Sequence, residues 1–547
     1  MKRCPKCRQS YTDDSLMYCP DDGAVLVDGS THAESETGLF STRGSFDRLR
    51  IEEAPQTSRR LTVVAITVGL FVIAVAIGWY LFSANKHTLK ADSIAILPLT
   101  NETGNSDLDY LSDGVAATLI NSFTGLSDLR VVPRGTAFTF RGRSIDPQEV
   151  GTKLGVDAVV SGRIMQNGDA FKAEIRLTDI GRNLKLWEQN FDLNLSDALT
   201  AQKQISAAVF DSLKLKLTNE DKQHFETALP NNSEAYLLYL KGLHETSLDT
   251  KDGLAKGRDY FDQAVTSDPK FALGYSSAAI NYIAAAERYV PAADALNKAE
   301  VSAQKALSLN DRVAAAHTSL AIIDWWKNRK FEQAEAEFRR ALELDPNDPR
   351  AHSYFGWFLI TIGRTGEGVQ QAKWATELDP LSVEMSGLLG QTYYFARNYN
   401  QAITQLKQTI DSDPNFWRGH SFLGRTYLRK DQFSPAIDEL KKAVELEPNV
   451  AENKAVLAFV YARAGKKDDG AHTFDALKKD ADIYLPKYDE AKYYIGIGDK
   501  DHAFELLDQE LAADSFHMTW LKVDPELDLL RDDPRFAQLV AKVGLPN

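Results

Sequence analysis

The chain has 547 residues, of which 44% are hydrophobic, so it is long enough for several domains and too apolar to be disordered throughout. Its 63 Lys and Arg residues are outnumbered by 77 Asp and Glu residues, and the formal net charge of −14 argues against a general polyanion binder. All three cysteines lie within the first 19 residues, so the chain after Cys19 holds no disulfide, thiolate metal site or cysteine nucleophile.

The N-terminal segment, residues 1–26, carries two similar turns that suit a metal ion. Cys4 and Cys7 belong to the first turn, and Cys19 and Asp22 occupy the matching places in the second. Zinc takes four ligands in a tetrahedron, and a segment this short needs such a staple to fold. We therefore predict zinc as a cofactor, bound by four side chains: Cys4, Cys7, Cys19 and Asp22.

Two alternatives remain open for this segment, because a carboxylate replaces the fourth thiolate. One is a degenerate relic without metal, and the other is a redox pair formed by the two cysteines of the first turn. The segment resembles the small zinc ribbons that begin many bacterial membrane and signalling proteins. Its basic side chains are balanced by acidic ones, so we expect no nucleic-acid partner.

A flexible linker and one membrane-spanning helix are predicted next. Residues 27–60 mix Ser, Thr, Gly and charged side chains without an apolar period, as linkers do. Residues 61–82 carry no charge. At ~1.5 Å rise per residue, a helix of this length spans a hydrocarbon core of about 30 Å.

The flanking charges predict the orientation of that helix. Five arginines precede it, including Arg59 and Arg60, whereas only Lys86 and Lys90 follow it closely. Because cytoplasmic flanks carry the excess of Lys and Arg, we expect a cytoplasmic N-terminus. All three thiols then lie on the reducing side of the membrane. Together with the resemblance above, this predicts a single-pass protein of a bacterial inner (cytoplasmic) membrane whose C-terminal domains are extracytoplasmic.

Residues 91–218 alternate between strand and helix patterns. A buried strand is predicted at 93–98 and an apolar helix at 111–123. The dipeptide Asn167-Gly168 separates two alternating strands and predicts a hairpin. We expect an α/β domain with a mixed sheet, one face of which is covered by helices.

The same region carries a family resemblance. The strings IAILPLTN (94–101) and VGTKLGVDAVVSGRIMQNG (150–168) resemble the TolB amino-terminal-like domain. In bacteria this module commonly lies just outside a membrane span and just before a tetratricopeptide array. The resemblance therefore implies an exterior domain followed by helical repeats.

A strict 34-residue period runs through the second half of the chain, marked by Pro346, Pro380, Pro414 and Pro448. Before each proline, small and large apolar residues recur at helical spacing, as Ala334, Phe338 and Ala341 do. The pattern is identified as the tetratricopeptide repeat (TPR), a helix pair that buries its faces only by stacking on neighbours. We predict about eight repeats over 232–515, forming an all-α superhelical solenoid, and capping helices at 516–547.

The register of the repeats places seven residues on the concave wall of the solenoid. Aromatic and arginine side chains are the usual anchors of protein interfaces. We therefore predict that a protein or peptide ligand in this groove contacts Trp357, Gln391, Tyr394, Arg425, Arg429, Phe459 and Arg463. The alternative is that several of these side chains pack against the next repeat.

No sequence motif predicts catalysis, since the chain has no phosphate-binding loop, GxSxG, HExxH or kinase signature. The chain resembles bacterial multi-domain TPR membrane proteins with a zinc-ribbon-like head, one transmembrane helix and a TolB-like exterior domain. Our primary hypothesis is a non-catalytic, membrane-anchored protein–protein interaction scaffold that uses its extracytoplasmic repeats. The alternative is a transmembrane signalling or transcription regulator that couples exterior binding to the cytoplasmic zinc-ribbon module.

Overall fold

The computed structural model describes residues 91–547 except 125, 127–128, 144–145, 168–169, 194, 214–228, 514 and 547. It also describes three short strands, Lys2–Arg3 (β1), Ser10–Tyr11 (β2) and Val27–Asp28 (β3). β1 lies between β2 and β3 and pairs antiparallel with both. The chain divides into two compact units, Met1–Lys86 and His87–Asn547.

Several predicted features lie outside the described residues. These are the four zinc ligands, nearly all of the linker and the membrane span at 61–82. Within the part of the chain that the structure describes, no helix is long and apolar enough to cross a membrane. The same part contains no group of three side chains able to hold a metal ion. The zinc site and the membrane helix therefore stay predictions.

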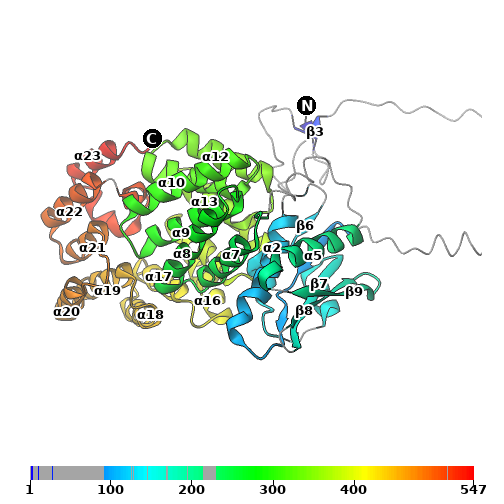
Figure 1. Ribbon diagram of the computed structural model, residues 1–547. Helices are drawn as coiled ribbons and strands as arrows, with labels where there is room; N and C mark the ends of the chain where they lie inside the picture. Colours follow the sequence, from blue (N-terminus) through cyan, green and yellow to red (C-terminus); the bar gives the residue numbers. More distant parts are fainter. Residues whose placement is uncertain are drawn as a thin grey trace, which may run out of the picture. The chain divides into compact units, whose positions relative to one another are not determined.

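The second unit contains a mixed β-sheet with the strand order β6-β4-β7-β8-β9, and β5 also pairs with β7 (Figure 1). Its strands are Ser93–Ile96 (β4), Thr100–Asn101 (β5), Arg130–Val131 (β6), Ala158–Asn167 (β7), Ala170–Asp179 (β8) and Leu184–Leu193 (β9). β4 runs parallel to β6 and β7, whereas β8 runs antiparallel to both of its neighbours. The predicted mixed sheet is confirmed.

Helices pack on this sheet through side chains that are fully buried, such as Ile94, Val159 and Ile175. They are Ser106–Leu108 (η1), Asp109–Phe123 (α2), Arg134–Phe138 (α3), Pro147–Leu154 (α4), Leu195–Asp197 (η2) and Ala198–Leu213 (α5). α4 illustrates how the sequence sets the bounds of a helix. The carboxylate of Asp146 accepts a hydrogen bond from the amide of Gln148, and Gly155 ends the helix at φ +60°.

The rest of the unit is a stack of antiparallel helix pairs. The first four pairs are formed by Ser233–Thr246 (α7), Lys251–Ser267 (α8), Ala272–Arg288 (α9), Ala292–Leu309 (α10), Ala314–Ile323 (α11), Phe331–Leu344 (α12), Pro349–Thr361 (α13) and Thr365–Leu378 (α14). The next four are formed by Val383–Phe395 (α15), Tyr399–Ser412 (α16), Trp417–Leu428 (α17), Phe433–Leu446 (α18), Ala451–Arg463 (α19), Lys467–Lys479 (α20), Lys487–Ile497 (α21) and Lys500–Ala512 (α22). The all-helical solenoid predicted from the 34-residue period is confirmed.

One repeat contains an additional residue, and the structure absorbs it as a single π turn, Asp324–Asn328 (η3), after α11. The turn ends at Arg329, whose φ is +52°. It places Trp325 and Trp326 inside the solenoid, where they are 0% and 1% exposed.

Three histidines at one position of the repeat each link two helices and a loop. They are His317, His352 and His420. In each, Nδ1 contacts a polar side chain of the second helix of the repeat, and Nε2 contacts the carbonyl of the residue six positions earlier. This matches the packed structural role that their shared register suggests.

His420 must carry a positive charge to make both of its contacts. Its Nδ1 lies 2.6 Å from Glu439 Oε2, and its Nε2 lies 3.0 Å from the carbonyl oxygen of Pro414. Both partners only accept hydrogen bonds, so both ring nitrogens donate. Burial alone would lower the pKa of His420, but these two hydrogen bonds raise it.

The His420→Gln substitution should therefore destabilise the chain more in acid than in base. A raised folded-state pKa gives a contribution that is fully present below the unfolded pKa of about 6.5 and is lost as pH rises through the folded value. We expect a loss of about 1–2 kcal/mol near pH 6 and a smaller one near pH 8.5, measured by urea unfolding. His352→Gln is the control, because its Nδ1 partner is the neutral amide of Gln371. Equal pH dependence in both variants would contradict the charged bridge.

The α/β domain docks on the solenoid through α3. The amide of Thr136 donates to Asp379 Oδ1 at 2.5 Å, and the amide of Leu381 donates to Thr136 Oγ1 at 3.0 Å. Burial raises the pKa of Asp379 to about 6, although the hydrogen bonds from Thr136 oppose this. Gly135 has no room for a side chain, since a Cβ there would lie 2.2 Å from Asp379 Oδ2.

Gly135→Ala should therefore loosen this docking. We expect a loss of about 1–3 kcal/mol in the free energy of unfolding, because the added methyl group overpacks the contact. Gly181→Ala is the control, since its Cβ would meet only Asp179 Oδ1 at 3.6 Å. Urea unfolding compares the two, and a Gly135→Ala variant as stable as the control would show that the contact is loose.

Candidate functional site

The structure buries most of the residues predicted to line an open groove. Trp357, Gln391, Tyr394, Arg425 and Phe459 are at most 5% exposed. Arg429 is partly buried and Arg463 is exposed. The expected exposure is therefore wrong for five of the seven residues. Partner binding by these residues stays a prediction.

Much of this burial is due to the C-terminal segment 516–530, which folds back along the first helices of the repeats, whereas Phe459 packs against Gly496 of the next repeat. It contains Phe516–Trp520 (η4) and Pro525–Leu530 (η5). The ring of Trp520 lies 5.6 Å from that of Trp325, 5.7 Å from that of Trp357 and 4.6 Å from that of Phe395. Pro534–Val543 (α23) packs on α22, the last helix of the stack. The capping of the stack by residues 516–547 stays a prediction.

The second half of this segment is held by charged side chains of the solenoid. Arg429 donates to the carbonyl oxygen of Pro525 at 2.7 Å. Arg397 forms two hydrogen bonds with Asp528, at 2.6 and 2.7 Å. Between Pro525 and Asp528 in the sequence, the side chain of Glu526 is fully buried.

Glu526 belongs to a buried network of charges centred on Lys492. The Lys492 ammonium lies 3.0 Å from Glu452, 3.0 Å from Asp489 and 3.1 Å from Glu526. Arg425 adds a second cation, 2.5 Å from Glu452 and 3.3 Å from Glu526. Burial alone would raise the pKa of the Glu526 carboxyl, but Arg425 and Lys492 hold it below its usual range. The network therefore depends on the charges being present together.

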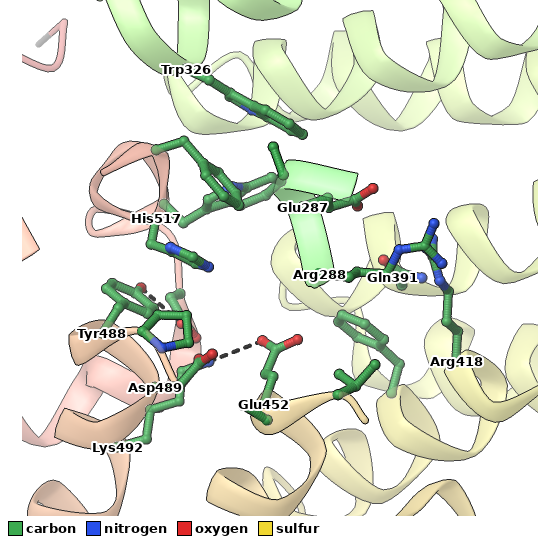
Figure 2. Close-up of a pocket in the computed structure, with 18 of the residues that line it drawn as sticks. Glu287, Arg288, Trp326, Gln391, Arg418, Glu452, Tyr488, Asp489, Lys492 and His517 are labelled. Atoms are coloured by element: carbon green, nitrogen blue, oxygen red, sulfur yellow. Dashed lines mark hydrogen bonds and ion pairs between the residues drawn. The ribbon is translucent and has the colours of Figure 1, made fainter. Parts of the chain in front are cut away.

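Beside the C-terminal segment, a cavity of about 110 Å³ remains inside the solenoid (Figure 2). Its apolar walls are aromatic rings from η3, α13, α15, α17 and η4, among them Trp326, Trp357, Phe395, Trp417, Phe422 and Trp520. Figure 2 shows Glu287, Arg288, Gln391 and Arg418 on one side of the cavity and Tyr488, Asp489 and His517 on the other. Residues far apart in the sequence thus form one pocket.

Most charged side chains that line this pocket have an ion-pair or hydrogen-bond partner among the described residues, and two have neither. Arg288 pairs with Asp249 through hydrogen bonds of 2.7 and 2.9 Å. Lys492 is paired with the carboxylates of the buried network described above. Glu287 and Arg418, in contrast, form no ion pair with any side chain in the described part of the chain. The Arg418 guanidinium lies 5.2 Å from the ring centroid of Trp417.

Three buried donors at the pocket also have no hydrogen-bond partner among the described residues. They are the indole N–H groups of Trp326 and Trp357 and the Nε–H group of Arg418. Buried polar groups are normally paired, so unpaired donors on a cavity wall mark places for ligand or water acceptors. Sequence analysis selected Trp357 and Gln391 in this pocket but missed Glu287 and Arg418.

The repeats define the class of the second unit. The sequence model of the tetratricopeptide repeat family matches residues 321–383 and 388–451. The solenoid therefore contains TPRs, a repeat class that forms protein–protein interaction scaffolds.

The α/β domain and the chain as a whole have other similarities. Residues 90–208 match the HilA/YgeH-like transcriptional regulator, second domain, and the TolB-like resemblance stays a prediction. A Rhizobium meliloti (strain 1021) protein named "Putative adenylate cyclase 3" is 24% identical over 245 residues, which are 44% of this chain. The matched part spans only 42% of that relative.

Solved structures that match part of the chain at low sequence identity include two further proteins. PilF of Pseudomonas aeruginosa is 20% identical, with 41% of this chain and 93% of PilF covered and a TM-score of 0.30. The human IFIT1 dimer with m7Gppp-AAAA is 13% identical, with 64% of this chain and 85% of that chain covered and a TM-score of 0.41.

Proposed function

We propose that the protein is a non-catalytic scaffold, anchored in a bacterial inner membrane by one helix, whose extracytoplasmic TPRs bind a protein or peptide partner. The observation that carries this proposal is the continuous stack of helix pairs from α7 to α22. The uncharged residues 61–82 and the arginines before them support the membrane anchor and its orientation. A zinc ion bound by Cys4, Cys7, Cys19 and Asp22 would order the cytoplasmic head.

The partner binds beside the C-terminal segment, not in its place. Removing the segment would expose Met518, Leu521, Leu527 and Leu530, all 0% exposed. At about 1.5–3 kcal/mol for each buried side chain, this costs about 6–12 kcal/mol. Such a cost equals the whole free energy of binding for a micromolar to nanomolar complex, about 8–12 kcal/mol. The pocket is accessible from solvent beside Tyr484, a lining residue that is 37% exposed.

Site-specific photocrosslinking tests this location. A photoreactive phenylalanine at Tyr484 should capture a partner protein from membranes of the source bacterium, because this side chain lies at the pocket mouth. The same group at Val301, which is 68% exposed on α10, should not. Equal capture at both positions, or none at Tyr484, would count against the proposal. Reporter fusions after residues 30 and 547 test the topology independently.

A second candidate function is a transmembrane signalling or transcription regulator that couples exterior binding to the cytoplasmic zinc-ribbon module. It is favoured by the match of residues 90–208 to the second domain of HilA/YgeH-like transcriptional regulators. Deleting residues 1–26 separates the two functions. A scaffold keeps its captured partner and leaves transcript levels unchanged, whereas a regulator changes transcription.

A further inference from the structure

The pocket has the size of a single small molecule. Its volume is about 110 Å³. An engineered apolar cavity of about 150 Å³ holds one benzene molecule, so this pocket accepts a compact ligand and not a folded peptide. The aromatic walls provide the apolar contact area that such ligands bury.

The unpaired groups of the pocket define the charge of that ligand. Glu287, on α9, and Arg418, on α17, form no ion pair with another described side chain, although Glu287 interacts at longer range with Arg288 and Arg418 with Asp249. Figure 2 shows both on the same side of the pocket. Burial raises the pKa of nearby Tyr354, and Glu287 and Arg418 act on it with opposite signs. The two charges therefore share one local environment.

Further unpaired donors accompany the cation. The indole N–H groups of Trp326 and Trp357 are buried without an acceptor, and so is the Nε–H group of Arg418. A carboxylate has two oxygens that can accept several hydrogen bonds, and it suits a guanidinium. A primary ammonium has three donors, and it suits the carboxylate of Glu287.

We propose that this pocket binds a free amino acid with a small aliphatic side chain. The carboxylate of the amino acid is received by Arg418 and the indole donors, and its ammonium group by Glu287. The side chain lies against the rings of Phe395, Phe422 and Trp520. The inference rests on the proposed function as a binding protein and names a second, small ligand for the same interior.

Calorimetric titration of the full-length chain with L-alanine and two singly charged analogues of the same size tests the proposal. Alaninamide keeps the ammonium group without the carboxylate, whereas propionate keeps the carboxylate without the ammonium group. We expect L-alanine to bind at least about tenfold more tightly than either analogue, because each lacks one charge-assisted contact. Quenching of the tryptophan residues that line the pocket provides a second readout.

Two variants assign the charges. In Arg418→Gln, alaninamide should bind as well as L-alanine, and in Glu287→Gln, propionate should bind as well as L-alanine. The exposed Arg463→Gln and Glu332→Gln variants are matched controls and should bind like the unaltered chain. Unchanged affinities in the pocket variants would overturn the proposal. So would the absence of saturable binding of L-alanine and the other small aliphatic amino acids at millimolar concentrations.

The two proposals fail separately. Capture of a partner at Tyr484 without amino acid binding would support the scaffold function and refute the amino acid site. Amino acid binding without capture would support the amino acid site and refute the scaffold function.

Discussion

Replacing Lys492 with methionine should destabilise the folded chain by about 3–5 kcal/mol, one of the two largest effects that we expect from a single substitution. The ammonium group lies within 3.1 Å of three carboxylates, on Glu452, Asp489 and Glu526. Its side chain is only 1% exposed, so water cannot replace it. Without the Lys492 ammonium group, the three buried carboxylates repel one another, and Arg425 is the main cation that remains near them.

The loss should shrink as the pH falls. In the variant, uncompensated carboxylates have folded-state pKa values above their unfolded ones, so their protonation at low pH restores stability. Burial already raises the pKa of Asp489 in the intact network. Lys542→Met is the control, because its ion pair with Asp508 is 57% and 54% exposed and contributes at most about 1 kcal/mol. Urea unfolding at several pH values would refute the network if both variants behaved alike.

Trp325→Ala should destabilise the chain by about 3–5 kcal/mol, since a fully buried indole would leave a large cavity. Its ring lies 5.6 Å from that of Trp520 in the C-terminal segment. The two substitutions Trp325→Ala and Trp520→Ala should therefore be coupled by about 0.5–1.5 kcal/mol in a double-mutant cycle.

A second cycle provides the control. Phe474 stacks on Tyr493, with 4.0 Å between the ring centroids, in a separate aromatic contact. Phe474→Ala and Trp520→Ala should be additive within about 0.5 kcal/mol. Additivity in both cycles would mean that Trp520 does not pack inside the solenoid.

The sequence was sufficient to predict the elements whose cause is local. The alternation around Asn167-Gly168 predicted the long hairpin of β7 and β8, and the interval from Pro346 to Pro448 predicted the helix pairs. The position of segment 516–530 was not predictable in this way. It has no repeat register, and its burial depends on the curvature of the whole stack.

The pocket was only partly predictable for the same reason. Sequence analysis considered the middle of the first helices, where Trp357 and Gln391 lie, and these do line the pocket. Glu287 and Arg418 lie instead near helix ends, on α9 and α17. The adjacent pair Trp417-Arg418 at the start of α17 was the only local signal, since an arginine beside an aromatic ring is common at binding sites.

Hydrogen exchange of the full-length chain tests the central claim most directly, namely that residues 516–530 pack inside the solenoid beside the pocket. The amides of this segment include that of Asp524, which donates to the Trp520 carbonyl at 2.9 Å, and that of Glu526, which donates to Asp524 Oδ1 at 2.9 Å. We predict that these amides exchange as slowly as those of α15 and α17, because they open only with the stack. Exchange within seconds, as in an exposed tail, would contradict the claim.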